Sequence, residues 1–236
     1  MTVASSSGPA AAVAIEPETR LEDEAREPSR IGLLGGTFDP PHFGHLVLAT
    51  IAAEQHQLDR VVFIPAGVPP HKQDQPVSGT TDRLLLTRLA IAGDPYFDLS
   101  PLEVERPGVS YTVDTVEQMR EIYGDAVELF LVMATDSLAQ VDSWRDPDRL
   151  LELTEWVVGP RPGSPAPTRQ VLMDRFGDRN DRIHLVDGPS LAISSSDLRA
   201  RVAAGRSIRY LVPAAVEEQI AARGLYRAPP SNATRR

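Results

Sequence analysis

Short, continuous apolar runs alternate along this chain with longer stretches in which apolar residues recur at helical spacing. Continuous apolar runs are typical of parallel strands that are buried on both faces. They lie at residues 31–34, 61–64 and 129–133, with weaker candidates at 156–158 and 183–186. The helix-like stretches lie near residues 44–56, 81–92, 112–123, 167–176, 195–204 and 213–223. This alternation predicts one α/β domain with a Rossmann-like open, mostly parallel sheet that carries helices on both faces.

Polar and small residues mark the ends of several predicted elements. Asp82 is placed to cap the second helix, and Gly93 and Gly124 follow the ends of the second and third helices. The stretch 159–168 is rich in proline, which predicts a surface loop that interrupts the domain and carries no recognisable chemistry.

The two ends of the chain differ from its middle. Residues 1–29 combine Ala, Ser, Pro and Glu with little apolar periodicity, and residues 228–236 have a similar character. Such segments cannot bury enough surface to offset the entropy lost on ordering. We therefore expect disordered tails on either side of one folded domain over residues 30–227.

Composition narrows the classes of function. The chain has 236 residues and a formal net charge of −9, which argues against nucleic acid or an anionic membrane surface as a partner. It contains no cysteine, which excludes disulfides and thiolate chemistry and fits a reducing compartment. No apolar run approaches the roughly 20 residues that span a bilayer, and no signal peptide is recognisable. We expect a cytoplasmic protein.

The segment from Gly35 to His45 carries the strongest chemical signal. It follows the first apolar run and leads into the first helix-like stretch, so it predicts a strand, a tight turn and a helix. The N–H groups and positive dipole end of such a helix start suit a phosphate. Gly35 and Gly36 permit close approach of the backbone to a ligand. His42 and His45 are three residues apart, so their side chains can point along the same side of the helix. One isolated histidine more often caps or packs, but this combination favours a nucleotide-phosphate site after the first strand.

A second candidate segment runs from Ile193 to Arg199. Consecutive serines precede Leu198 and predict a capped helix, with Arg199 one turn further on. Alone, this pattern is typical of any well-capped helix. Combined with the first segment, its hydroxyl donors and guanidinium predict a grip on the same polyphosphate from the opposite side.

These two segments together resemble the motifs of the nucleotidyltransferase superfamily, which joins a nucleotide to a phosphomonoester. Further segments narrow the resemblance to the bacterial nicotinate mononucleotide adenylyltransferases, over roughly residues 30–227. These segments are Pro69–Lys72, Ser110–Thr115, Asp136 with Trp144, and Arg206–Pro213.

The resemblance implies that ATP is one substrate. His42, His45 and Arg199 would then be catalytic and would contact the ATP phosphates. The implied ATP-binding set also includes Gly35, Gly36, Thr37, Phe38, Asp136, Ser195 and Ser196. Within this set Asp136 would bind a ribose hydroxyl.

The resemblance implies nicotinate mononucleotide as the second substrate. Lys72, with His71, would meet its phosphate, Thr112 and nearby backbone N–H groups would hold the nicotinate carboxylate, and Trp144 would lie against the pyridine ring. Each of these residues also has a purely structural interpretation: Lys72 as a solvated loop lysine, Thr112 as a helix cap and Trp144 as a core residue.

The implied reaction gives nicotinate adenine dinucleotide and pyrophosphate, a step of NAD biosynthesis. No covalent enzyme intermediate is implied, and Mg²⁺ would be bound through substrate phosphates rather than by a metal site of the chain. One departure from the family pattern is visible: Ala134 stands where the family has a glycine two residues before Asp136. Its methyl group lies where the backbone approaches the nucleotide.

Several alternatives remain open at this point. Another adenylyl- or cytidylyltransferase, acting on phosphopantetheine or an alcohol phosphate, would share both phosphate motifs. A non-catalytic nucleotide sensor would use the same cleft without turnover. An aminoacyl-tRNA synthetase core is disfavoured, because the chain lacks the length and the basic surface for tRNA. The preference for nicotinate over nicotinamide mononucleotide stays undecided, and so does assembly into a homo-oligomer.

Overall fold

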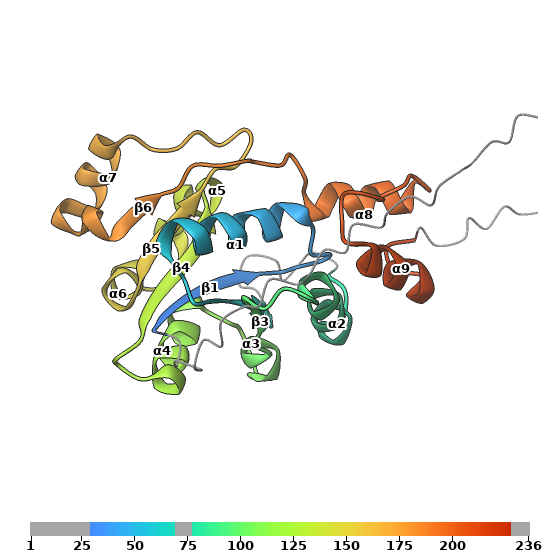
Figure 1. The fold of residues 1–236 in the computed structure, drawn as a ribbon, viewed down its shortest axis with the longest axis horizontal. Coiled ribbons are helices and arrows are strands. Elements are labelled where there is room, and N and C mark those ends of the chain that lie inside the picture. The colour runs from blue at the N-terminus through green and yellow to red at the C-terminus, as the bar shows by residue number, and fades with distance from the viewer. Residues whose placement is uncertain (1–28, 69–76, 228–236) are drawn as a thin grey trace, which may run out of the picture.

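Six parallel strands form one open sheet in the order β3-β2-β1-β4-β5-β6 (Figure 1). They are β1 (Arg30–Gly36), β2 (Arg60–Pro65), β3 (Phe97–Leu99), β4 (Glu128–Ala134), β5 (Glu155–Gly159) and β6 (Ile183–Leu185). This computed structural model describes residues 29–68 and 77–227. The predicted open parallel sheet is confirmed, whereas the segments predicted to be disordered tails lie outside the described residues, apart from residue 29.

Helices cover both faces of the sheet, as predicted. Because successive side chains of a strand point to opposite faces, the apolar runs supply two separate cores: Leu34 belongs to one and Leu33 to the other. The first core contains residues of α1 (Phe43–His56), α2 (Thr80–Ile91), α8 (Ser195–Ala203) and α9 (Ala214–Arg223). The second contains residues of α4 (Thr112–Tyr123), α5 (Thr135–Ala139), α6 (Pro147–Leu153) and α7 (Arg169–Phe176).

The connectivity creates a crevice between β1 and β4. The chain passes from β1 outwards to β2 and β3, then returns to place β4 on the other side of β1. The connections that leave the carboxyl ends of β1 and β4 therefore diverge, and ligands bind at such a switch point in open α/β sheets. In Figure 1, α8 and α9 lie together at one end of the molecule, next to the start of α1.

The elements that the sequence did not predict are short. β3 has three residues with Asp98 at its centre, so it presents no apolar run. The helices α3 (Leu102–Glu105), α5 and α6 are too short to establish helical periodicity, as are the 3-10 turns Val141–Ser143 and Gly177–Arg182.

The capping predictions have mixed outcomes. Gly93 and Gly124 follow their helices with φ angles of 92° and 79°, as expected of glycines at such positions. The prediction for Asp82 is wrong: Gly79 is the N-cap residue of α2. Asp82 lies in the first turn and accepts a hydrogen bond from Arg223 of α9 at 2.7 Å, because packing of α9 on α2 brings that guanidinium within reach.

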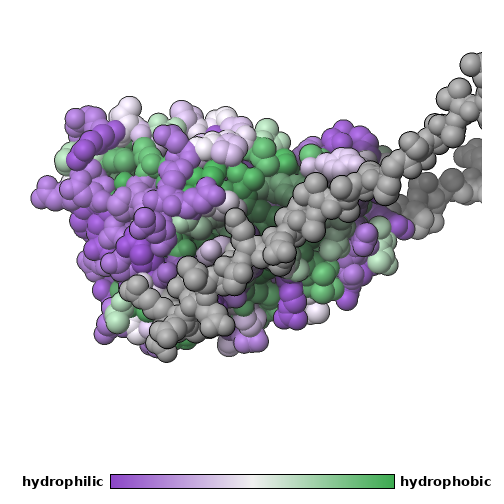
Figure 2. Space-filling model, viewed as in Figure 1, coloured by the Kyte–Doolittle hydropathy of each residue, from purple (hydrophilic) through white to green (hydrophobic). Residues whose placement is uncertain are grey.

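The surface is mixed in polarity. Figure 2 shows hydrophilic residues over α7 and β6, whereas hydrophobic residues are visible near the centre of the view, over α1. Leu46, Val47 and Leu48 of α1 are only partly buried against the core beneath them. Within residues 29–68 and 77–227, no helix is long and apolar enough to cross a membrane.

Candidate active site

A cavity of about 520 Å³ opens at the carboxyl ends of β1 and β4. Leu34–Gly36 and Leu131–Ala134 line it from the sheet, and the starts of α1, α4, α5 and α8 surround it. Every predicted site residue that the structure describes lines this cavity: Gly35, Gly36, Thr37, Phe38, His42, His45, Thr112, Asp136, Trp144, Ser195, Ser196 and Arg199. The other two, His71 and Lys72, lie outside the described residues.

The two histidines of the first motif stack on each other at the start of α1. His42 is the N-cap residue, and its ring centroid lies 3.8 Å from that of His45. The Nδ1 atom of His45 accepts a hydrogen bond from the backbone N–H of His42 at 3.2 Å. A neutral His45 therefore carries its proton on Nε2, which makes that atom the donor of the ring.

Phe38 shapes the turn between β1 and α1. Its φ of 48° is a left-handed conformation that bulky residues rarely adopt, and such strain is retained where the surrounding structure holds it. The ring is fully buried and meets His45 edge to face, with the ring centroids 5.0 Å apart. The buried Phe38 ring thus stabilises the turn and also fixes the position of the His45 ring.

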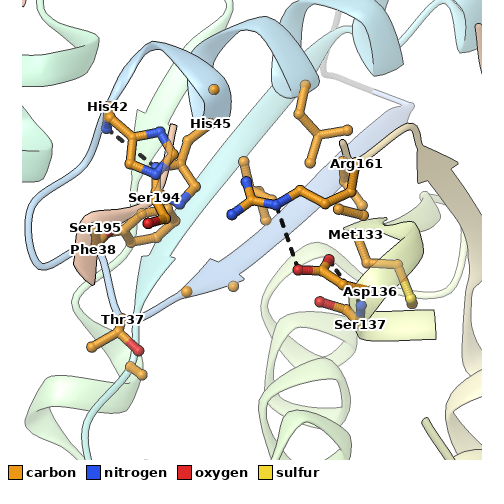
Figure 3. Close-up of a pocket in the computed structure, with 18 of the residues that line it drawn as sticks. Thr37, Phe38, His42, His45, Met133, Asp136, Ser137, Arg161, Ser194 and Ser195 are labelled. Atoms are coloured by element: carbon orange, nitrogen blue, oxygen red, sulfur yellow. Dashed lines mark hydrogen bonds and ion pairs between the residues drawn. The ribbon is translucent and has the colours of Figure 1, made fainter. Parts of the chain in front are cut away.

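The second motif contacts the first on the same side of the cavity (Figure 3). Ser194 caps α8 by accepting a hydrogen bond from the Asp197 N–H at 3.1 Å. The Ser195 hydroxyl donates to the Pro40 carbonyl, and the Arg199 guanidinium donates to the Asp39 carbonyl, both at 2.8 Å. Segments about 155 residues apart along the chain are therefore in direct contact at one cavity.

Arg161 faces the two histidines from the opposite wall, where the sequence predicted no chemistry. Its Nε lies 3.6 Å from the Asp136 carboxylate, and Figure 3 shows the pair across the cavity from His42, His45 and Ser195. The proline-rich loop is anchored, because the Thr135 hydroxyl donates to the Ser164 carbonyl at 2.9 Å. The expectation that this loop lacks chemistry is therefore wrong, because the guanidinium of its Arg161 lines the cavity.

Burial and charge keep His42 neutral. Desolvation, reinforced by the positive charge of Arg161, lowers the pKa of His42 to about 4. Among the described residues, the buried Nδ1 atom forms no hydrogen bond of good geometry; its nearest donor is the His45 N–H, in a capping-box arrangement. A buried polar atom without a partner is costly in a folded protein, so this atom is suited to meet a ligand in the cavity.

The start of α4 forms the far end of the cavity. Tyr111 is the N-cap residue, and no side chain caps this helix, so its first N–H groups and dipole favour an anion. The half-buried Trp144 and the neighbouring Arg145 also line this end. The Arg145 guanidinium lies 4.8 Å from the centre of the Tyr111 ring. An aromatic face and positive potential are therefore adjacent here.

Ala134 sits at the end of β4 with φ −98° and ψ 164°, an extended conformation open to any residue. The backbone at this position therefore does not require glycine. Alanine in place of the family's glycine adds one methyl group to the cavity wall without strain.

An open parallel sheet with two helix starts and a cationic wall at its switch point defines a nucleotide-binding α/β protein. Residues 33–201 match the cytidylyltransferase-like family. A protein of Moorella thermoacetica named "Probable nicotinate-nucleotide adenylyltransferase" is 44% identical over 85% of this chain and 93% of its own length. A protein of Thermomicrobium roseum with the same name is 47% identical over 84% of this chain and 92% of its own.

Solved structures agree at the level of fold. The Plasmodium falciparum nicotinic acid mononucleotide adenylyltransferase complexed with NaAD superimposes with a TM-score of 0.70 at 18% identity, over 84% of this chain and 97% of that one. The chain belongs to the cytidylyltransferase-like family and, within it, to the nicotinate-nucleotide adenylyltransferases.

The depressed pKa of His42 predicts an acid-sensitive fold. In the unfolded chain this histidine takes up a proton near pH 6.5, but in the folded protein only near pH 4, so stability falls as the pH drops through this interval. We expect His42 to account for a loss of about 2 kcal/mol between pH 7 and pH 5. Urea unfolding of the wild type and of His42→Gln at both pH values measures it. A difference in stability between the two proteins that stays constant with pH would contradict the prediction.

Proposed function

We propose that this chain transfers the adenylyl group of ATP to nicotinate mononucleotide, giving nicotinate adenine dinucleotide and pyrophosphate. The observation that carries the proposal is the contact of Ser195 and Arg199 with the turn before α1, because it brings two helix starts onto one cavity. Relatives of 44–47% identity that carry the name of this enzyme support the choice of substrates.

The ATP triphosphate would lie between the starts of α1 and α8. His42 and His45 would donate from the start of α1, while Ser196 and Arg199 would donate from the adjoining start of α8. The neutral imidazole of His42 suits this role, since a neutral ring still offers an N–H donor and carries no charge into the buried site. Arg161 on the opposite wall would supply a full positive charge, and Asp136 would accept from a ribose hydroxyl.

Nicotinate mononucleotide would lie towards the start of α4. Its carboxylate would accept from the backbone and hydroxyl of Thr112, where the helix dipole favours a negative charge. Trp144 would cover the pyridine ring, and Arg145 would add positive potential. This anionic preference supports nicotinate over nicotinamide as the acceptor base. His71 and Lys72 remain our candidates for the acceptor phosphate.

A magnesium ion bound to the substrate phosphates fits this site. Among residues 29–68 and 77–227, no group of three or more His, Asp and Glu side chains could hold a metal ion. The cavity presents imidazole, hydroxyl and guanidinium donors with Asp136 on one wall, so the ion would be bound mainly by phosphate oxygens and water. When bound, it neutralises charge on the phosphates.

The chemistry needs alignment more than a reactive side chain. An oxygen of the mononucleotide phosphate attacks the α-phosphorus of ATP, a new P–O bond forms, and the bond to the β-phosphate oxygen breaks to release pyrophosphate. The attacking oxygen is already an anion, so no general base is required. The donors of α1 and α8 hold the two anions in line and stabilise the charge that develops on pyrophosphate.

Separate incubations with different acceptors test the proposal. The full chain is mixed with ATP, Mg²⁺ and either nicotinate mononucleotide, nicotinamide mononucleotide or phosphopantetheine, and the products are separated by chromatography. We expect the fastest formation of dinucleotide and pyrophosphate with nicotinate mononucleotide. A product from phosphopantetheine alone would overturn the acceptor, and ATP binding without pyrophosphate release would identify a sensor.

Removing the His45 imidazole should slow the reaction. We expect His45→Ala to lower kcat by about 10²-fold, the scale for loss of one preorganised donor. His56→Ala is the matched control, because His56 ends the same helix and does not line the cavity. Steady-state kinetics and circular dichroism of both variants check this. Near-normal turnover by His45→Ala would remove His45 from the proposed role.

Replacing Arg161 should weaken the hold on the anionic substrates. Methionine replaces the aliphatic stem of arginine but removes the charged guanidinium, so Arg161→Met should lower kcat/KM for ATP by roughly 10- to 100-fold, the range for a lost charged hydrogen bond. Arg169→Met is the control, since Arg169 forms an exposed ion pair with Asp181 outside the cavity. Equal kinetics of the two variants would exclude a contact between Arg161 and substrate.

A further inference from the structure

Arg83 of α2 is a buried arginine outside the cavity lining. It is only 1% exposed, and its guanidinium donates to three backbone carbonyls from different segments. Nη1 donates to Thr37 at 3.0 Å, Nη2 to Gly67 at 3.2 Å, and Nε to Ser78 at 3.2 Å. One side chain therefore links three stretches of backbone. The pairing of β1 with β2 ends at Gly36 and Pro65, and the Ala66 N–H still donates to the Gly36 carbonyl at 2.8 Å, so Arg83 extends this link beyond the paired strands.

Two of these stretches lead to different parts of the cavity. Thr37 lies in the turn that would face ATP. Gly67 packs against the acceptor end: a Cβ atom at this position would lie 2.1 Å from the Glu103 carbonyl oxygen and 2.6 Å from the Ser110 hydroxyl. Glu103 and Ser110 both line the cavity beside the start of α4. The guanidinium of Arg83 thus connects the backbone of the ATP side to the backbone that packs against the acceptor side.

The surroundings of Arg83 balance its charge. Burial lowers the pKa of Arg83, and the negative charge of the nearby Asp39 is the largest influence that opposes this shift. Asp39 is itself 1% exposed and accepts from the Tyr226 hydroxyl at 2.6 Å and the Ser78 N–H at 3.1 Å. An uncompensated buried charge would be strongly destabilising, so the negative charge of Asp39 offsets the positive charge of Arg83 in the folded protein.

We propose that Arg83 is a positioning residue for adenylyl transfer, which sets the distance between the turn at Thr37 and the backbone at Gly67, and hence between the two substrates. This inference rests on the proposed function. Each substrate would still bind in its own part of the cavity without Arg83. What depends on Arg83 is the in-line placement of the acceptor oxygen against the α-phosphorus, and small errors in such placement are costly to the rate.

The test replaces Arg83 by lysine, which keeps the charge opposite Asp39 but cannot direct donors along the three fixed directions of a guanidinium. We expect kcat to fall by about 10²-fold, while the dissociation constants of ATP and of nicotinate mononucleotide, measured separately by calorimetry, change by less than about threefold.

Arg120→Lys is the matched control. Arg120 of α4 also donates to three backbone carbonyls, those of Gly124, Val127 and Leu153, but none of these three residues lines the cavity, whereas Thr37 does. We expect this variant to keep its kcat. An equal fall in kcat for Arg120→Lys, or an unchanged kcat for Arg83→Lys, would overturn the inference. Loss of binding of both substrates by Arg83→Lys would also overturn the inference, because Arg83 would then contribute only to the stability of the fold.

A second variant covers the case in which Arg83→Lys does not fold. Arg83→Ala is assayed with added methylguanidinium, which can occupy the vacated space and restore the three donors. Recovery of kcat at constant substrate affinity supports the inference, and recovery of the folded state without recovery of kcat contradicts it. Failure of the proposed function itself would appear differently, as absence of dinucleotide with the wild-type chain.

Discussion

The contact between the start of α8 and the turn after β1 is the interaction on which the site depends. Ser195 and Arg199 donate to the carbonyls of Pro40 and Asp39, so the second motif is fastened to the backbone of the first. The sheet explains why these segments can meet: the strand order reverses beside β1, and the crevice that results leaves room for a helix start on either side. Without this contact, the chain would have two separate helix starts instead of one site for a polyanion.

The electrostatics resolve an apparent conflict between an acidic chain and an anionic ligand. The chain has a formal net charge of −9, yet the cavity wall gathers two histidines, Arg161 and Arg199. Burial holds His42 at the cap of α1 neutral, so in the function that we propose part of the binding would come from dipoles and N–H donors rather than from net charge. A site of this kind need not attract anions over a long range, and it fits a small substrate held closely rather than a long polymer.

The sequence predicted the sheet and both phosphate motifs because these follow local rules. Buried parallel strands leave continuous apolar runs, and helix starts leave capping residues and glycines. The missed parts depend on long-range contacts. Arg161 lies in a proline-rich loop, and only the anchors of that loop turn its side chain towards Asp136. Arg83 and Tyr226 resemble ordinary helix and tail residues until the fold brings them to Thr37 and Asp39. Three-residue β3 lacks any periodic signal.

The backbone of the turn from Thr37 to Pro40 suits the anion site that we propose. Every carbonyl oxygen is a centre of negative charge, so a turn that faces a phosphate must direct its carbonyls elsewhere. In this turn Arg83 of α2 donates to the carbonyl of Thr37, and Arg199 and Ser195 of α8 donate to the carbonyls of Asp39 and Pro40. Pro40 and Pro41 carry no N–H group, so neither leaves an unpaired donor there. These carbonyl oxygens therefore accept hydrogen bonds from the protein itself. The N–H groups of α1 and the imidazoles would then be left to contact the phosphates.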